Sequence, residues 1–307
     1  MNIRIISERI EAIHQNQEMG ATQLAREAVR LLGEIAEDPE IPISLFPELL
    51  AGASRDLARA RPSMASIYNA VGSLVAAWLE SGGESNVAAA RAAVAEAARR
   101  WIARQEAAAG VIADHAAEVI GGTVITLSFS STVLRTLEEC WSRDLLEEVI
   151  VAESRPLCEG RRTAETLGSR GIPTTLITDA QMGLFAAEAR AAVVGADTIR
   201  PNGSLTNKSG TLLLALAARR CRVPFYALAE THKIAPNVGP FRTPTLEEKD
   251  PRELLAEPLP GVTVRNIYFD LTPARYITGY ITEAGVLNRQ EVASLAQKAP
   301  GAILAAQ

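Results

Sequence analysis

Hydrophobic residues follow two different spacings along this chain of 307 residues. Up to about residue 118 they recur every three to four positions, as at Ile3, Ile6, Ile10 and Ile13, and this period predicts amphipathic helices. Further helices are expected over 23–37 and from about 43, and another begins at the turn over 59–69 and runs to about 80. The alanine-rich span 86–120 is expected to form one helix or two. The sequence therefore predicts a helical N-terminal domain over residues 1–118.

The spacing changes after Gly121-Gly122, where short apolar runs begin to alternate with amphipathic segments. The predicted strands are 123–127, 148–152, 174–178, 192–195, 225–229 and a last one at 264–270. The predicted helices are 131–142, 160–170, 181–187, one from 211 to 220, and one near the end of the chain. Because such an alternation is typical of a parallel sheet with helices on both faces, we predict an α/β protein whose second domain, 119–307, is a mostly parallel, doubly wound sheet.

The stretch from 192 to 211 places polar residues at a predicted strand end. Asp197 stands where the strand ends, a Pro201-Asn202-Gly203 turn follows, and Asn207 and Lys208 lead into the next helix. In open parallel sheets, ligands bind outside the carboxyl ends of the strands, with anions at helix N-termini. Asp197 can exchange a proton or accept a sugar hydroxyl, and Lys208 can bind a phosphate. The alternative is an aspartate that caps a turn beside an ordinary surface lysine, but the combination favours a site.

Three serines follow the first predicted strand: Ser128, Ser130 and Ser131. Hydroxyl groups and free backbone N–H groups at the start of a helix suit a phosphate. Alternatively, Ser130 or Ser131 is a plain N-cap of the helix. No histidine is placed in the sequence to pair with Ser128, so we do not interpret this serine as an activated nucleophile.

Other polar residues follow the later predicted strands. Arg155 follows the second strand, and its planar guanidinium suits a phosphate or a carboxylate. A salt bridge from Arg155 to Glu153 or Glu159 is an equally good explanation. Asp179, after the third strand, is expected to cap a helix, and His232, after the fifth, is expected to be structural.

Composition narrows the classes of protein that this chain can belong to. Hydrophobic residues make up 48% and charged residues 22%, which is typical of a globular protein. The net charge is −5 without a basic stripe, so we expect no direct nucleic-acid partner. Three scattered cysteines without a CxxC pair, and three histidines, predict neither a disulfide framework nor a metal site, and no cofactor is expected. No apolar run can span a bilayer and the first residues lack a signal peptide, so we expect a cytoplasmic protein without membrane contact.

Seven motifs then occur in a fixed order: Met19-Gly20-Ala21 with Ala25-Arg26, Arg61–Ser66, Ser128–Leu134, Glu153–Pro156, Gly195–Asp197 with Asn207–Thr211, Ala229–Lys233, and Phe269–Pro273 with Ile281–Glu283. Together they resemble the superfamily of the alpha, beta and delta subunits of translation initiation factor 2B. This superfamily also contains methylthioribose-1-phosphate isomerase and ribose-1,5-bisphosphate isomerase. The resemblance covers nearly the whole chain, and residues 62–66 and 178–183 make it strongest for the archaeal alpha-type factor.

The resemblance implies a helical N-terminal domain on a Rossmann-like C-terminal domain, with a ligand in the crevice between them and dimers joined through the second domain. The isomerases of the superfamily use a cysteine and an aspartate as a paired acid and base. Asp197 matches that aspartate, whereas Ser128 stands at the position of the cysteine. A thiol exchanges protons near neutral pH far more readily than an unassisted alcohol. Met19 is a second departure, because the isomerases carry an arginine before Gly20-Ala21.

The resemblance also implies a set of ligand-binding residues: Gly20, Ala21, Arg26, Arg61, Ser128, Ser130, Ser131, Arg155, Asp197, Asn207 and Lys208. The predicted function is that of a regulatory protein similar to the alpha subunit of initiation factor 2B, which binds AMP or a sugar phosphate. The alternative is an aldose–ketose isomerase of a phosphorylated pentose, with Asp197 as the base. A structural subunit with a vestigial pocket is a third interpretation. A homodimer or a higher homo-oligomer is expected in each case.

Overall fold

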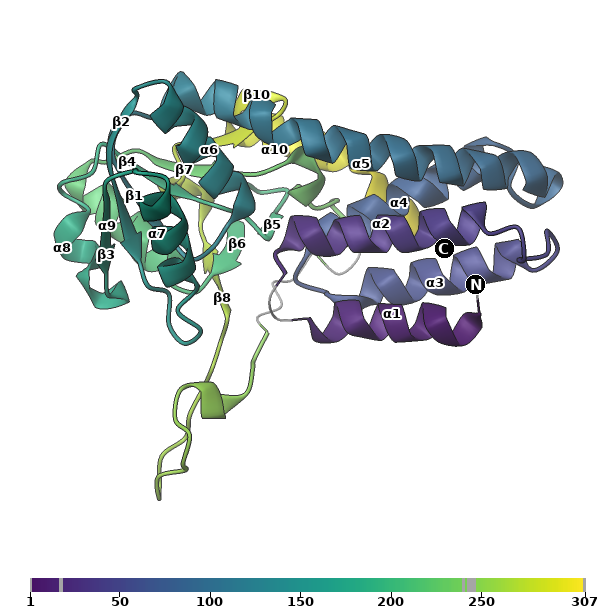
Figure 1. Ribbon diagram of the computed structural model, residues 1–307, viewed down its shortest axis with the longest axis horizontal. Coiled ribbons are helices and arrows are strands. Elements are labelled where there is room, and N and C mark those ends of the chain that lie inside the picture. The colour runs from purple at the N-terminus through teal and green to yellow at the C-terminus, as the bar shows by residue number, and fades with distance from the viewer. Residues whose placement is uncertain (1, 17–18, 239–240, 242–246, 306–307) are drawn as a thin grey trace. The chain divides into compact units, whose positions relative to one another are not determined.

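A computed structural model of the chain describes residues 2–16, 19–238, 241 and 247–305 (Figure 1). The chain forms two compact units, and neither is continuous in sequence. The first consists of Met1–Ala107, His232–Thr243 and Ser294–Gln307, and the second of Ala108–Thr231 and Pro244–Ala293. The sequence analysis instead expected two continuous domains that meet at 118/119.

A buried amide in the first unit explains why later segments of the chain return to it. The Asn69 side chain donates to the carbonyl oxygens of His232 and Ile234, each at 2.8 Å, and accepts from the backbone N–H of Gly301 at 3.0 Å. A Cβ atom at Gly72 would lie 2.6 Å from Cα of Gly301, so these backbones approach each other closely. Hydrophobic periodicity does not report contacts of this kind between distant segments.

The first unit is helical, as predicted. Its elements are α1 (Ile3–Gln15), α2 (Ala21–Glu37), α3 (Phe46–Ala60), α4 (Ala65–Glu80), η1 (Gly83–Asn86), the first part of α5 (Val87–Ala117) and η7 (Pro300–Ala305). The alanine-rich span forms the single helix α5, which continues into the second unit. Buried leucines such as Leu24, Leu57 and Leu74 fill the core between the helices, as the spacing of apolar residues requires.

A seven-stranded, mostly parallel sheet organises the second unit, with strands in the order β10-β9-β7-β4-β1-β2-β3. The strands are β1 (Gly122–Leu127), β2 (Leu146–Ala152), β3 (Thr174–Ile177), β4 (Ala191–Val194), β7 (Phe225–Leu228), β9 (Gly279–Thr282) and β10 (Gly285–Leu287). Only β10 runs antiparallel to its neighbour. The strand order reverses direction between β1 and β4, and this reversal is where ligands bind in open parallel sheets.

Helices cover the sheet on both faces, which confirms the predicted fold class. They are α6 (Ser131–Ser142), α7 (Glu159–Ser169), α8 (Met182–Phe185), α9 (Thr211–Cys221) and α10 (Arg289–Gln297). Apolar residues of α6, α7 and the end of α5 pack on one face, while α9 contacts β4 and β7 (Figure 1). The short 3₁₀ turns are η2 (Asp179–Gln181), η3 (Thr231–Lys233), η5 (Pro251–Glu253) and η6 (Ala274–Tyr276). Among the described residues, no helix is long and apolar enough to cross a membrane.

A second, antiparallel sheet differs from the sequence prediction. It consists of β5 (Thr198–Ile199), β6 (Leu205–Lys208) and β8 (Phe269–Thr272), in the order β5-β6-β8. The last strand was expected at 264–270, and β9 and β10 were not predicted. These strands are two to four residues long, so they present no apolar run or alternation long enough to detect.

Candidate functional site

The carboxyl ends of β1 and β4 meet where the strand order reverses. Gly195 follows β4, and a Cβ atom there would lie 2.7 Å from Oγ of Ser130, which follows β1. Only glycine therefore lets the end of β4 approach the start of α6 so closely. The sequence analysis selected both strand ends, and the structure brings them together.

Ser128 and Ser154 lie at the ends of adjacent strands in unusual backbone conformations. Their φ angles are +61° and +62°, in the left-handed region that non-glycine residues seldom adopt. The backbone N–H of Ser128 donates to Oγ of Ser154 at 2.7 Å, and the carbonyl oxygen of Ser128 accepts from Oγ1 of Thr163 at 2.7 Å. Ser154 is only 1% exposed. Left-handed residues of this kind concentrate at functional sites, where the surrounding structure holds them in place.

Ser130 acts as an N-cap, which was the plainer of the two interpretations offered for it. Its Oγ accepts from the backbone N–H of Val133 at 3.4 Å, and Ser131 is the first residue of α6. A capping hydroxyl occupies one of the free N–H groups of the helix start. An anion at this end of α6 would meet the remaining ones.

Asp179 organises the loop after β2. Its carboxylate accepts from the backbone N–H groups of Ser154 at 2.8 Å and Arg155 at 2.7 Å. The expectation that Asp179 caps a helix was wrong, because Thr178 is the N-cap of η2. Sequence spacing indicated a polar strand end here, but not which backbone groups the carboxylate would bind.

Arg155 does not form either of the salt bridges that the sequence offered. Glu153 pairs with Arg161, with Nη2 2.6 Å from Oε2, and Glu159 pairs with Lys208. No carboxylate in the described part of the chain pairs with the exposed guanidinium of Arg155. This arginine is therefore available for an external anion.

Asp197 and Asn207 lie on neighbouring segments of the small sheet. The backbone N–H of Asp197 donates to the carbonyl oxygen of Thr206 at 3.1 Å, and Nδ2 of Asn207 donates to Oγ1 of Thr211 at 3.0 Å. Asn207 and Lys208 were expected to lead directly from the turn into a helix. This prediction was wrong, because both residues belong to strand β6, which pairs with β8 and places Asn207 opposite Asp270. The pairing of β5 with β6, in which Thr198 lies opposite Thr206, places Asp197 next to the strand that carries Asn207.

Lys208 is a buried cation with a carboxylate partner. It is 7% exposed, and its Nζ lies 2.5 Å from Oε1 of Glu159 and 4.4 Å from the centre of the Tyr268 ring. The other oxygen of Glu159, Oε2, is buried without a hydrogen-bond partner among the described residues. A phosphate that binds Lys208 must therefore compete with Glu159, a role the sequence analysis missed. Glu159 was named from the sequence only as an alternative salt-bridge partner of Arg155.

Asp270 occupies the start of α9, where an anionic ligand could otherwise bind. Its carboxylate accepts from the backbone N–H groups of Gly210 at 2.9 Å and Leu212 at 3.0 Å. Burial raises the pKa of Asp270 to about 6, against the lowering effect of these hydrogen bonds. The sequence analysis placed Asp270 in a strand and gave it no role at the site.

The remaining predicted site residues belong to the first unit. Gly20 is the N-cap of α2, and the carbonyl oxygen of Ala21 accepts from Oγ of Ser66 at 3.1 Å. Arg61 donates to the carbonyl oxygen of Asn16 at 2.7 Å, and Nε of Arg26 is buried without a hydrogen-bond partner among the described residues. The role of these four residues in ligand binding stays a prediction.

Comparison with known proteins relates the chain to one family. The model of the initiation factor 2 subunit family matches residues 17–289. The chain is 36% identical to a translation initiation factor eIF-2B subunit 2-like protein of Pyrococcus horikoshii over 270 residues, 87% of this chain and 91% of that protein. It is 37% identical to the ribose 1,5-bisphosphate isomerase of Archaeoglobus fulgidus over 286 residues, 92% and 89% of the two chains. A crystal structure of Pyrococcus horikoshii translation initiation factor eIF-2B superposes with a TM-score of 0.79 at 34% identity, covering 94% and 98%.

Proposed function

This chain belongs to the initiation factor 2 subunit family, and from that membership we propose that it is a regulatory protein similar to the alpha subunit of initiation factor 2B. In this proposal, a nucleotide or sugar phosphate binds at the carboxyl ends of β1 and β4. AMP and ribose 1,5-bisphosphate are the two ligand types to test.

One observation carries the proposal that binding occurs without turnover. Ser128 stands where the isomerases of the superfamily carry their cysteine, and no described residue hydrogen-bonds to its Oγ. The second unit contains one histidine, His115, whose Nδ1 lies 2.8 Å from the carbonyl oxygen of Thr282. An alcohol without a neighbouring base is a poor proton donor and acceptor near neutral pH. The groups that suit ligand binding are nevertheless present in Arg155, Asp197 and Lys208.

The roles of Lys208 and Glu159 predict opposite effects on ligand affinity. Lys208→Ala is expected to weaken AMP or ribose 1,5-bisphosphate binding by about 1.5–3 kcal/mol, the range for a hydrogen bond to a charged group. Glu159→Gln is expected to strengthen binding by about tenfold, because the neutral amide no longer repels the phosphate that approaches Lys208. Isothermal titration calorimetry of the two variants measures both effects.

Two controls separate ligand binding from folding. Glu165→Gln removes an exposed carboxylate from the same helix and is expected to leave the affinity unchanged. The unphosphorylated compounds, adenosine and ribose, are expected to respond little to Lys208→Ala. Equal losses for phosphorylated and unphosphorylated ligands would mean that Lys208 shapes the fold and does not hold the phosphate.

Isomerisation of a phosphorylated pentose is the second candidate function. The observation in its favour is Asp197, the residue at the isomerases' aspartate position, whose backbone N–H donates to Thr206 on β6, the strand that also carries Asn207. The identity of 37% to a ribose 1,5-bisphosphate isomerase supports the same candidate. An assay of the wild-type protein with ribose 1,5-bisphosphate decides between the two functions.

We also propose that the chain forms a homodimer through the outer face of α9. Leu213 and Leu216 lie on one side of this helix and are 49% and 42% exposed, and the exposed Leu184 belongs to α8, which packs against α9. Apolar side chains that cluster on a surface commonly mark an interface, and a two-fold dimer pairs such a face with itself.

Replacing Leu213 and Leu216 together by glutamate is therefore expected to give a monomer, because four carboxylates would be buried in the paired faces. Light scattering coupled to size-exclusion chromatography measures the mass of the wild-type protein and of this variant. Leu79→Glu, at an equally exposed leucine of α4, is the control and is expected to remain dimeric. A double variant with the mass of a dimer would show that the interface lies elsewhere.

A further inference from the structure

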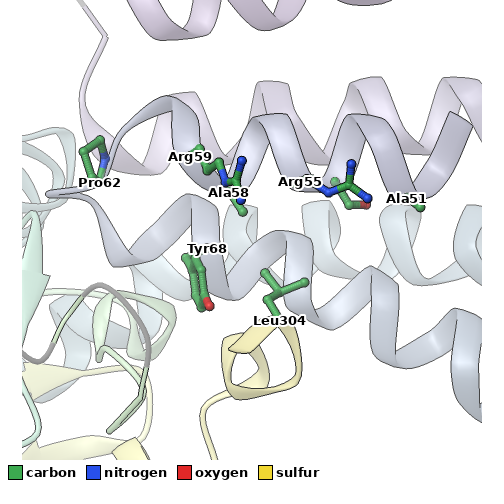
Figure 2. A pocket seen from close by; sticks show the side chains of 8 residues that line it. Ala51, Arg55, Ala58, Arg59, Pro62, Tyr68 and Leu304 are labelled. Atoms are coloured by element: carbon green, nitrogen blue, oxygen red, sulfur yellow. The ribbon is translucent and has the colours of Figure 1, made fainter. Parts of the chain in front are cut away.

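A cavity of about 420 Å³ lies within the first unit, between α3, α4 and the C-terminal 3₁₀ helix η7. Its volume is in the range of pockets that hold small ligands. The residues that line it are Ala51, Ser54, Arg55, Ala58, Arg59, Pro62, Tyr68 and Leu304, seven of which Figure 2 labels. None of them was selected by the sequence analysis as a site residue, and none is shared with the site proposed in the second unit.

Two arginines give the cavity its charge. Arg55 and Arg59 lie four residues apart on α3, so both guanidinium groups project from the same side of the helix (Figure 2). Neither forms an ion pair with a carboxylate in the part of the chain that the structure describes, and none of the described residues that line the cavity is acidic. The cavity therefore offers two positive charges to an anion.

Ser54 supplies an unused hydrogen-bonding group. This residue is 3% exposed, and its Oγ is buried without a hydrogen-bond partner among the described residues. Because leaving a buried hydroxyl unpaired costs about 1–3 kcal/mol, buried polar groups nearly always have a partner. A ligand in the cavity would supply the hydrogen-bond partner that Oγ of Ser54 lacks.

Tyr68 adds a second hydroxyl on the opposite wall, where Figure 2 shows it beside Leu304. Burial raises the pKa of this phenol, so it stays protonated and can donate. The remaining lining residues, Ala51, Ala58, Pro62 and Leu304, are apolar. A ligand that fits the cavity consequently combines an anionic group with an apolar body.

We propose that this cavity is a binding site for a phosphate monoester with a small apolar or aromatic body. A phosphate dianion has enough acceptor oxygens to pair with both Arg55 and Arg59 and to accept from Ser54, whereas a carboxylate is satisfied by one guanidinium fork. The apolar body packs between Ala58 and Leu304. The inference does not depend on the function proposed for the second unit.

Phenyl phosphate is the probe that tests the proposal, by calorimetric titration of the full-length protein. We expect saturable binding of phenyl phosphate, and much weaker binding of inorganic phosphate or of phenol alone. Arg55→Gln with Arg59→Gln is expected to weaken binding at least tenfold, and Ala58→Leu, which fills the cavity, is expected to abolish it. Arg100→Gln with Arg104→Gln, at two exposed arginines of α5, is the charge-matched control and is expected to bind as the wild type does.

Ser54→Ala distinguishes a binding site from a purely structural pocket. This variant is expected to bind phenyl phosphate several-fold more weakly, yet to unfold at an equal or higher temperature without ligand, because it removes an unpaired buried hydroxyl. Lys208→Ala, which disables the proposed site of the second unit, is expected to retain phenyl phosphate binding. Absence of binding to the wild-type protein, or a loss with Lys208→Ala but not with the double arginine variant, would overturn the inference.

Discussion

Replacing Ser128 by cysteine is expected to raise the isomerisation of ribose 1,5-bisphosphate from background to a readily measured rate. A thiol has a pKa of about 8.5, so it exchanges protons near neutral pH, and a positioned acid or base typically contributes about 10²–10⁴-fold. The substitution changes one atom, and the hydrogen bonds that hold residue 128 involve only its backbone. The new thiol should therefore lie where the serine hydroxyl lies now. Product formation is followed by coupled assay or by NMR.

Two further variants test whether the gain comes from a paired acid and base. Asp197→Asn in the Ser128→Cys protein is expected to abolish the gain, because the amide cannot accept the proton. Ser131→Cys introduces a thiol three residues away, at the start of α6, and is expected to give no activity. Robust turnover by the wild-type protein would contradict the regulatory function. A Ser128→Cys variant that binds the sugar but stays inert would direct attention to Met19, where the isomerases carry an arginine.

Gly160→Ala is expected to destabilise the protein by about 3 kcal/mol or more, at the upper end of the cost of overpacking. A Cβ atom at this position, near the start of α7, would lie 1.9 Å from the carbonyl oxygen of Ala152 at the end of β2. The obstacle is backbone and cannot rotate away, so the strand end or the helix must move. Urea unfolding followed by circular dichroism measures the loss.

Gly168 in the same helix provides a matched control. No atom lies within 4 Å of a Cβ built there, so Gly168→Ala is expected to stabilise the protein by about 0.5 kcal/mol through helix propensity. If Gly160→Ala destabilises the protein and Gly168→Ala stabilises it, the loss at Gly160 comes from its close approach to β2. If both alanine variants were stabilised, the start of α7 would not need this glycine.

The parallel sheet was predictable from sequence because its strands are buried on both faces. Runs such as residues 149–152 and 191–194 are fully buried and entirely apolar, and a helix follows most of them. Because all parallel strands end at the same edge, the positions of Ser128 and Asp197 followed from the alternation of strands and helices. The serines, Arg155 and Asp197 were selected for that reason.

Contacts between distant segments were not predictable in the same way. The ion pair between Lys208 and Glu159 joins β6 to the start of α7, and nothing in either local pattern specifies the partner. Asp270 caps α9 only because β8 pairs with β6, and both strands are too short to give a periodic signal. Local patterns thus located the polar strand ends, while tertiary pairing decided which charges remain free for a ligand.

The order in which the units can be completed during synthesis follows from the return of residues 294–307 to the first unit. All residues of the second unit precede position 294, whereas the helices of the first unit must wait for η7 to reach α4. In most multidomain chains the N-terminal domain folds first as it leaves the ribosome. Here α1 to α4 emerge first and can pack on one another, but the surface of α4 that η7 covers stays exposed until the sheet has been translated.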